Sequence, residues 1–202
     1  MMMQTGVWLL VAGVALCSAE QNQRKRESVH LPDSSLHLSL TIRADRQSYQ
    51  LNDTVPLEVR LTNTGPGTLY LFDDVCWNPG NFLTLEVFTV SGKEVSVPIT
   101  YLRDCLPPPP RRNDTSRFFR LEPQTFYGVL EKYAVRELVA EPGEYDVVVH
   151  YEGALSTDWI AKYGGARLAA LPIWTREQPL LTSNRLRINV KPWVVVENLA
   201  IN

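Results

Sequence analysis

The stretch PGEYDVVVHY, residues 142–151, decides the fold class of this chain. Pro-Gly forms a turn, and the residues that follow alternate in polarity along an extended segment. One face of that segment carries only apolar and aromatic side chains: Tyr145, Val147, Val149 and Tyr151. A strand with one apolar face has to bury it against a second layer. The stretch therefore predicts one strand of a β-sandwich, preceded by its corner.

The same alternation returns along the rest of the chain and predicts further strands. They lie at residues 36–43, 55–62, 68–72, 82–88, 94–97, 118–128 and 184–191. The segment 118–128 is interrupted at Glu122-Pro123, and Ser91-Gly92-Lys93 predicts a hairpin turn. Residues 129–140 fit neither the helix period nor the strand period, so a short helix and irregular structure both remain open. Several half-apolar strands in one chain favour two packed sheets.

The N-terminal residues predict export. The apolar run from Val7 to Cys17 is too short to span a bilayer but has the length of a signal-peptide core. Cleavage after Ala19 makes residues 1–19 a signal peptide, followed by a flexible leader at 20–34. The alternative is a lipid anchor on Cys17. The protein is thus expected to be secreted or periplasmic, or else lipid-anchored at the cell envelope. At the other end of the chain, residues 192–202 are expected to form a short tail.

An exported chain forms disulfides, and cleavage leaves two cysteines, Cys76 and Cys105. We expect them to form one disulfide; two buried free thiols are the alternative. Asn52 and Asn113 each begin an Asn-X-Thr sequence, the acceptor pattern for N-glycosylation. Both sites have meaning only in a host that glycosylates such sequences.

A resemblance to known modules rests on residues 47–72, QSYQLNDTVPLEVRLTNTGPGTLYLF. This passage resembles the opening of extracytoplasmic immunoglobulin-like modules, including macroglobulin-like domains and the sandwich of the intracellular proteinase inhibitor family. Residues 142–151 resemble the late strand of those modules, where Tyr145 would make a tyrosine corner. The resemblance implies a single all-β, immunoglobulin-like antiparallel β-sandwich over residues 35–191, with a long loop before its last strand.

The sequence offers little that points to catalysis or to a cofactor. Its formal charge of −2 indicates neither a nucleic acid nor an anionic membrane as partner. The chain has three histidines, His30, His37 and His150, and none stands in a recognisable nucleophile or zinc motif. Asp73-Asp74 and Asp104 could collect calcium, but solvated turns are the better interpretation. We therefore expect that the protein is not an enzyme and that it binds neither a metal ion nor a cofactor.

Two loops are candidate binding sites. The connection from Glu152 to Ser183 contains Trp159, Tyr163 and Trp174, which would stack on a sugar or fill a partner's pocket. The alternative is that these aromatic residues cap the open end of the sandwich.

The second loop, Arg103–Arg112, contains four consecutive prolines and ends in Arg111 and Arg112. A stiff loop presenting arginine suits an inhibitor of trypsin-like proteases, because preorganisation lowers the entropic cost of binding. A solvated connection is the alternative. We conclude that the sequence predicts an exported, noncatalytic module for recognition of a protein or glycan. A proteinase inhibitor is the second hypothesis, and a carbohydrate-binding module or an enzyme without a recognisable motif is the third.

Overall fold

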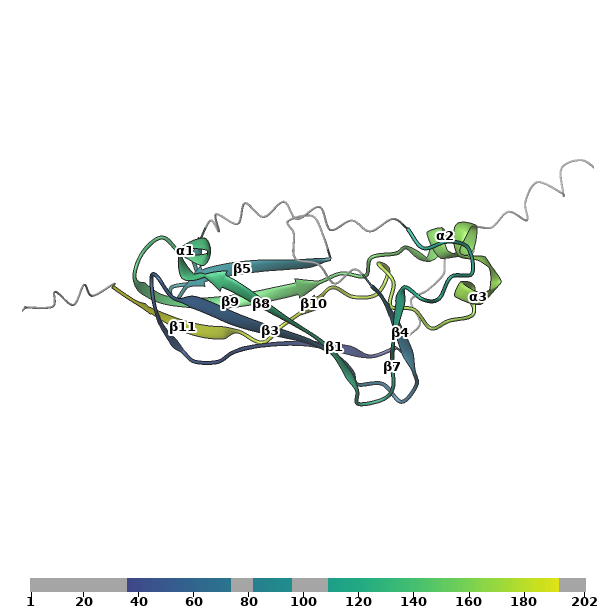
Figure 1. Cartoon of the computed structure of the whole chain (residues 1–202), viewed down its shortest axis with the longest axis horizontal. Helices are drawn as coiled ribbons and strands as arrows, with labels where there is room; N and C mark the ends of the chain where they lie inside the picture. The colour runs from purple at the N-terminus through teal and green to yellow at the C-terminus, as the bar shows by residue number, and fades with distance from the viewer. Residues whose placement is uncertain (1–35, 74–81, 96–108, 193–202) are drawn as a thin grey trace, which may run out of the picture. The chain divides into compact units, whose positions relative to one another are not determined.

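Two β-sheets face each other in the computed structural model, which describes residues 36–73, 82–95 and 109–192 (Figure 1). The first sheet has the order β1-β3-β8, from strands β1 (Leu38–Ala44), β3 (Thr54–Asn63) and β8 (Phe126–Ala134). The second sheet has the order β2-β11-β9-β5-β6, and β10 also pairs with β9. Its strands are β2 (Ser48–Gln50), β5 (Leu83–Thr89), β6 (Glu94–Val95), β9 (Gly143–Tyr151), β10 (Leu181–Thr182) and β11 (Leu186–Lys191).

The core forms because both sheets alternate in polarity. On β3 every second residue from Val55 is buried, and on β1 Leu38, Leu40 and Ile42 are buried on the same face. On the other flanking strand, β8, Tyr133 is buried and Tyr127 and Val129 are half-buried. Strand β9 supplies the opposite face and is buried nearly throughout, since it lies between β11 and β5. Leu57, Val59, Val147, Val149 and Ile188 all belong to this one apolar cluster. The sandwich is therefore held by burial of the faces that the sequence marks as apolar.

The strand order is that of an immunoglobulin-like domain. Such domains place strands A, B and E in one sheet and strands C, F and G, with C′ in some, in the other. Here β1, β3 and β8 take the places of A, B and E, whereas β5, β6, β9 and β11 take those of C, C′, F and G. The hydroxyl of Tyr145, at the start of β9, donates a hydrogen bond to the carbonyl oxygen of Glu141 at 2.9 Å. The predicted fold class and tyrosine corner are both confirmed.

Several boundaries differ from the sequence prediction. Strand β1 begins at Leu38 rather than residue 36, and β11 begins at Leu186 rather than residue 184. Asn184 bonds across the sandwich instead: its Oδ1 accepts from the N–H of Ile42 at 2.9 Å, and its Nδ2 donates to the Ile42 carbonyl at 3.1 Å. The ambiguous segment 129–140 continues β8 to Ala134 and then forms the short helix α1 (Val135–Leu138).

The hairpin predicted at Ser91-Gly92-Lys93 joins β5 to β6. Gly92 adopts a φ of 84°, in the left-handed region that favours glycine. The N–H of Thr89 donates to the Lys93 carbonyl at 2.8 Å, and the N–H of Gly92 donates to the Thr89 carbonyl at 2.8 Å. The turn therefore has the backbone that its sequence indicates.

A second apolar core lies beside the sandwich and was not predicted. Strands β4 (Leu69–Phe72) and β7 (Phe118–Leu121) form their own two-stranded sheet. The connection after β9 folds over it as α2 (Thr157–Trp159), the π-helix η1 (Ile160–Gly164) and α3 (Gly165–Ala169). The buried members of this core are Phe72, Phe118, Leu155, Ile160, Leu168 and Ile173. The long connection is thus ordered, because it has apolar side chains of its own to bury.

Several sequence predictions lie outside the described residues. They include the signal peptide at 1–19, the leader at 20–34, lipidation of Cys17 and the Cys76–Cys105 disulfide. The Arg103–Arg112 loop before Pro109 and the tail after residue 192 also lie outside. Among the residues that the structure does describe, no helix is long and apolar enough to cross a membrane.

Candidate functional site

The helical connection begins with a well-satisfied N-terminus. The hydroxyl of Ser156 accepts a hydrogen bond from the N–H of Trp159 at 3.1 Å. The carboxylate of Glu177 accepts bonds from the N–H and the hydroxyl of Thr157, at 3.0 and 2.8 Å. Burial of Glu177 opposes its ionisation, but hydrogen bonds from Thr157, together with those from Thr175 and its own backbone, outweigh this and lower the pKa. The start of the connection is therefore fixed to the segment that follows α3.

The π-helix η1 turns one side toward the second core and the other toward solvent. Ile160 and Gly164 are buried, and a Cβ at Gly164 would lie only 3.1 Å from Leu168. Tyr163 is 50% exposed, and its ring centroid lies 5.8 Å from that of half-buried Trp159. The ammonium of Lys162 lies 5.0 Å from the centroid of the Tyr163 ring. A cation and two aromatic rings thus lie together at the surface.

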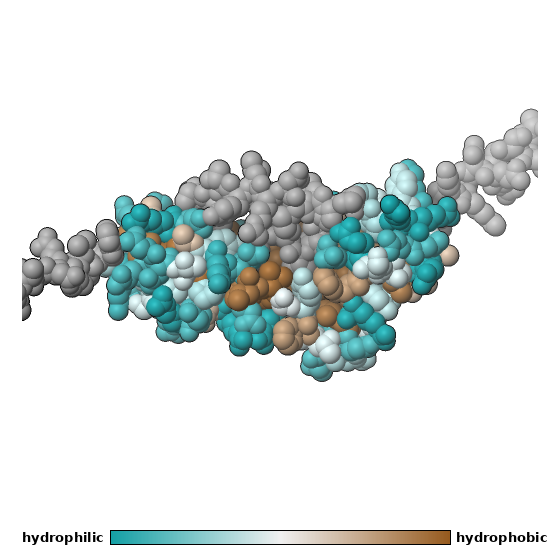
Figure 2. Space-filling view, in the orientation of Figure 1, coloured by the Kyte–Doolittle hydropathy of each residue, from teal (hydrophilic) through white to brown (hydrophobic). Residues whose placement is uncertain are grey.

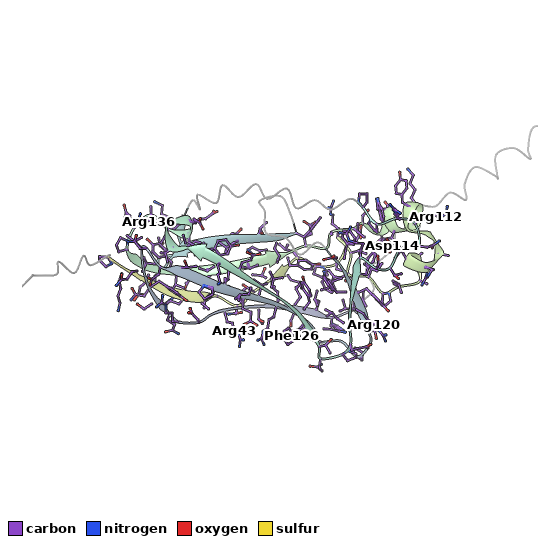
Figure 3. All side chains as sticks on the ribbon, in the orientation of Figure 1. Arg43, Arg112, Asp114, Arg120, Phe126 and Arg136 are labelled. Atoms are coloured by element: carbon purple, nitrogen blue, oxygen red, sulfur yellow. The ribbon has the colours of Figure 1, made fainter. Side chains whose placement is uncertain are left out.

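The segment before β7 is attached to these helices by Asn113. Its N–H donates to the Gly164 carbonyl at 2.7 Å, and its Oδ1 accepts from the N–H of Arg167 at 3.0 Å. Gly165, with a φ of 76°, allows close approach: a Cβ there would lie 2.5 Å from Asn113 Oδ1 and 2.9 Å from Cγ of Arg112. The aliphatic stem of Arg112 therefore packs beside Gly165, and Figure 3 shows Arg112 and Asp114 next to α2 and α3.

We call the exposed side chains of these two contacting segments the Arg–Tyr surface. Its members are Arg111, Arg112, Lys162, Tyr163 and Arg167. The same segments carry two carboxylates, Asp114 and Asp158. Hydrogen bonds from the hydroxyl and the N–H of Ser116 lower the pKa of Asp114, so this group is ionised and offsets part of the positive charge. The surface nevertheless carries more cations than anions, in a chain whose formal charge is −2.

The predicted binding residues differ in exposure, and half-buried Trp159 packs against the second core. Arg111, Arg112 and Tyr163 are exposed and lie on contacting segments. Trp174 is only 3% exposed and belongs to the sandwich core, so its ring has no face open to a ligand. This corrects its assignment to a binding site and agrees with the alternative that loop aromatics cap the sandwich. Its Nε1 has no hydrogen-bond partner within the described part of the chain.

Sequence reasoning missed three contributors to this surface: Lys162, Arg167 and the anchoring role of Asn113. Asn113 has a φ of 62°, a conformation that asparagine tolerates better than most residues. The signal was present, because Asn-Asp after two arginines indicates a turn and Gly164-Gly165 indicates close backbone approach. Neither pattern says that the two segments meet.

The remaining predicted sites are placed as follows. Of the two predicted glycosylation sites, Asn52 is exposed in the turn before β3. Asn113 is half-buried, and its side-chain oxygen accepts the hydrogen bond from Arg167. Of the aspartates weighed for calcium, Asp73 is described, and Asp74 and Asp104 are outside the described residues. No group of three potential metal ligands occurs within 36–73, 82–95 and 109–192.

Comparison with known proteins shows no family for this chain. No protein-family model and no curated protein matches the sequence. Among solved structures, the CARDB domain of a Pyrococcus furiosus protein in complex with di-metal ions is similar at 10% identity and a TM-score of 0.34, covering 78% of this chain and 96% of that one. The sporulation control protein Spo0M of Bacillus subtilis has 9% identity and a TM-score of 0.37, covering 76% of this chain and 49% of that one.

A β-glucosidase from Erythrobacter marinus has 15% identity and a TM-score of 0.34. That similarity covers 77% of this chain, which spans only 16% of the enzyme's length. Similarity at this level says nothing about activity. The fold assignment rests on the strand order and the tyrosine corner described above.

Proposed function

We propose that this chain is an exported, noncatalytic recognition module that binds an acidic protein or glycan through the Arg–Tyr surface. The main support for the proposal is that Asn113 attaches the segment Arg111–Asn113 to η1 and α3. Its N–H donates a hydrogen bond to the Gly164 carbonyl, and its side-chain oxygen accepts one from the N–H of Arg167. A loop that is already fixed loses little conformational entropy when a partner binds.

The composition and the local structure of the surface support this role. Arginine and tyrosine are enriched among the residues that contribute most to binding free energy. A π-helix is rare in globular proteins and occurs often at functional sites. Excess positive charge beside the exposed ring of Tyr163 favours an anionic partner with flat or apolar groups, since both cation pairing and stacking are then satisfied.

The test is a binding screen with matched variants. The mature protein is applied to a glycan array that includes sulfated and uronic-acid sugars, and to a panel of acidic peptides. For any ligand found, Arg112→Ala and Tyr163→Ala should each weaken binding about tenfold or more, as truncation of a central contact does. Arg136→Ala is the matched control: it removes an exposed arginine on α1, far from Arg112 in Figure 3. Equal loss in all three variants, or none, contradicts the proposal.

A proteinase inhibitor remains the second candidate, favoured by the exposure of Arg111 and Arg112 directly before the anchored Asn113. An inhibitor needs an arginine that can enter the specificity pocket of a trypsin-like enzyme. Arg111 suits this better, because the stem of Arg112 packs beside Gly165. Inhibition of trypsin that is abolished in Arg111→Ala and retained in Tyr163→Ala would favour this candidate over the first.

Export is part of the proposal and has its own measurement. Mass spectrometry of the mature N-terminus distinguishes cleavage after Ala19 from lipidation of Cys17. Alkylation of the native protein distinguishes a Cys76–Cys105 disulfide, which leaves no reactive thiol, from two free cysteines. A retained N-terminus with Cys17, Cys76 and Cys105 all reactive would contradict export.

A further inference from the structure

The two edge strands of the first sheet, β1 and β8, differ in the hydrogen bonds that their outer backbone groups make. At the β1 edge, the side chain of Asn184 bonds both the N–H and the carbonyl of Ile42. At the other edge, β8 is nine residues long and pairs with β3 alone among the described strands. Such an edge offers a row of backbone donors and acceptors to another strand.

The register shows which backbone groups face outward. Residues of an antiparallel pair alternate between hydrogen-bonded and non-hydrogen-bonded partners. Pro56 lies opposite Lys132 and lacks an N–H, so this pair is non-hydrogen-bonded. Beyond the two ends of the ladder, the N–H of Asn63 donates to Thr125 and the N–H of Val135 donates to Asp53, which fits the same alternation.

It follows that alternate residues of β8 direct their N–H and carbonyl groups away from β3. These residues are Phe126, Gly128, Leu130 and Lys132. Their side chains share the outer face of the sheet, where Phe126 is 51% and Leu130 is 60% exposed. Natural sheet edges are commonly protected by several charges, a proline or a bulge. On this row Lys132 is the one charged residue.

The surroundings of the edge are also apolar and cationic. The guanidinium of Arg60, on β3, lies 4.5 Å from the centroid of the Phe126 ring. Figure 3 labels Phe126 on the ribbon, and Figure 2 shows brown, hydrophobic atoms over the region where Figure 1 draws β8. An incoming strand would thus find backbone partners together with a ring and an aliphatic side chain on the same face.

We propose that β8 pairs antiparallel with β8 of a second copy of this chain, joining the two three-stranded sheets into one. The two-fold axis passes beside Val129. A residue that precedes Val129 by some number of positions then lies opposite the residue that follows Val129 by the same number in the second copy. In this register every outward N–H of the row meets a carbonyl. The occupant is a second copy because β8 is complementary to itself in this register.

The complementarity lies in the side chains that the two-fold axis brings together. Phe126 lies opposite Lys132 of the second copy, which pairs an aromatic ring with a cation. Leu130 lies opposite Gly128 of the second copy, so a large side chain extends over a residue that has none. A shift by two residues in either direction breaks both pairings: one register places Gly128 opposite itself, and the other places Leu130 opposite itself.

The experiment compares two substitutions at one residue. Leu130→Pro removes an outward N–H without removing a bond to β3, whereas Leu130→Ala keeps that N–H. Sedimentation of the mature protein over a wide concentration range should show a reversible shift from monomer mass to twice that mass. Leu130→Pro should stay monomeric, and Leu130→Ala should still dimerise, at severalfold higher concentration. Circular dichroism shows whether each variant keeps the sandwich.

A second variant keeps the proposal falsifiable if the proline variant does not fold. Lys132→Glu leaves the backbone unchanged but replaces the cation opposite Phe126, so it should raise the dimer dissociation constant several times. Arg112→Ala, on the separate Arg–Tyr surface, should leave dimerisation unchanged, so this test and that of the proposed function can fail independently. A wild-type protein that stays monomeric at the highest concentration overturns the proposal. A dimer unaffected by both Leu130→Pro and Lys132→Glu also overturns it.

Discussion

Asn113 makes two separable contributions to the Arg–Tyr surface, and two substitutions tell them apart. Its side chain accepts one hydrogen bond from Arg167, and its backbone occupies the left-handed region at a φ of 62°. Asn113→Gly removes the hydrogen bond but adopts this backbone conformation easily. Asn113→Ala removes the same bond and also has to place a Cβ-bearing residue in a strained conformation.

The expected destabilisation follows from those two contributions. Loss of one hydrogen bond costs about 1 kcal/mol of unfolding free energy. The left-handed conformation costs an alanine roughly a further 1 kcal/mol or more. We therefore expect Asn113→Gly to lose about 1 kcal/mol and Asn113→Ala about 2 kcal/mol. The N–H of residue 113 still reaches the Gly164 carbonyl in both variants.

Urea denaturation measures the free energies, and hydrogen exchange locates the effect. The amide of Arg167 should lose protection equally in both variants, since both remove its acceptor. The reasoning is refuted if Asn113→Gly is less stable than Asn113→Ala. It is also refuted if the Arg167 amide exchanges at the wild-type rate in either variant.

Two further predictions concern tyrosine hydroxyls in the sandwich. Tyr145→Phe keeps the ring but removes the bond to the Glu141 carbonyl, so it should lower the unfolding free energy by about 1 kcal/mol in urea, whereas Tyr163→Phe at the surface should not. Burial, together with the hydrogen bond that Tyr49 donates to Asp45, raises the pKa of Tyr49 from 10.0 to about 12. The Tyr49 hydroxyl holds its proton more tightly in the folded protein than in the unfolded chain, so the proton stabilises the fold fully below pH 10. The free energy of unfolding should fall by roughly 2 to 3 kcal/mol as pH rises from 10 to 12. Urea midpoints at several pH values in that range should decline less steeply in Tyr49→Phe, and parallel curves would contradict this.

The sandwich was predictable because its strands carry their own signal. In residues 142–151 the alternation, the preceding Pro-Gly and the position of Tyr145 all agree, and the structure has the strand, its corner and the hydroxyl bond. Residues 129–140 gave no clear period, because β8 is an edge strand with exposed apolar side chains and is followed directly by a helix. Local pattern identifies a strand well only where one face is buried and the other is wet.

The candidate site was only partly predictable, because it depends on contacts between distant segments. Composition marked the aromatic residues of the connection but could not separate buried Trp174 from exposed Tyr163. Nothing local indicates that Asn113 reaches Gly164 and Arg167, which lie some fifty residues further along the chain. The second core that orders this connection likewise combines residues from β4, β7 and the helices.

The parallel pairing of β2 with β11 has a mechanical consequence. Ser48, Tyr49 and Gln50 lie beside Asn189, Val190 and Lys191, so strands near the two ends of the described chain run side by side in the same direction. Tension applied between Ser48 and Lys191 pulls these strands in opposite directions along their length. The hydrogen bonds between them then carry the load together and must break at once, whereas bonds in a ladder pulled from one end break one after another. A short contact of three residue pairs thereby makes the domain resist stretching.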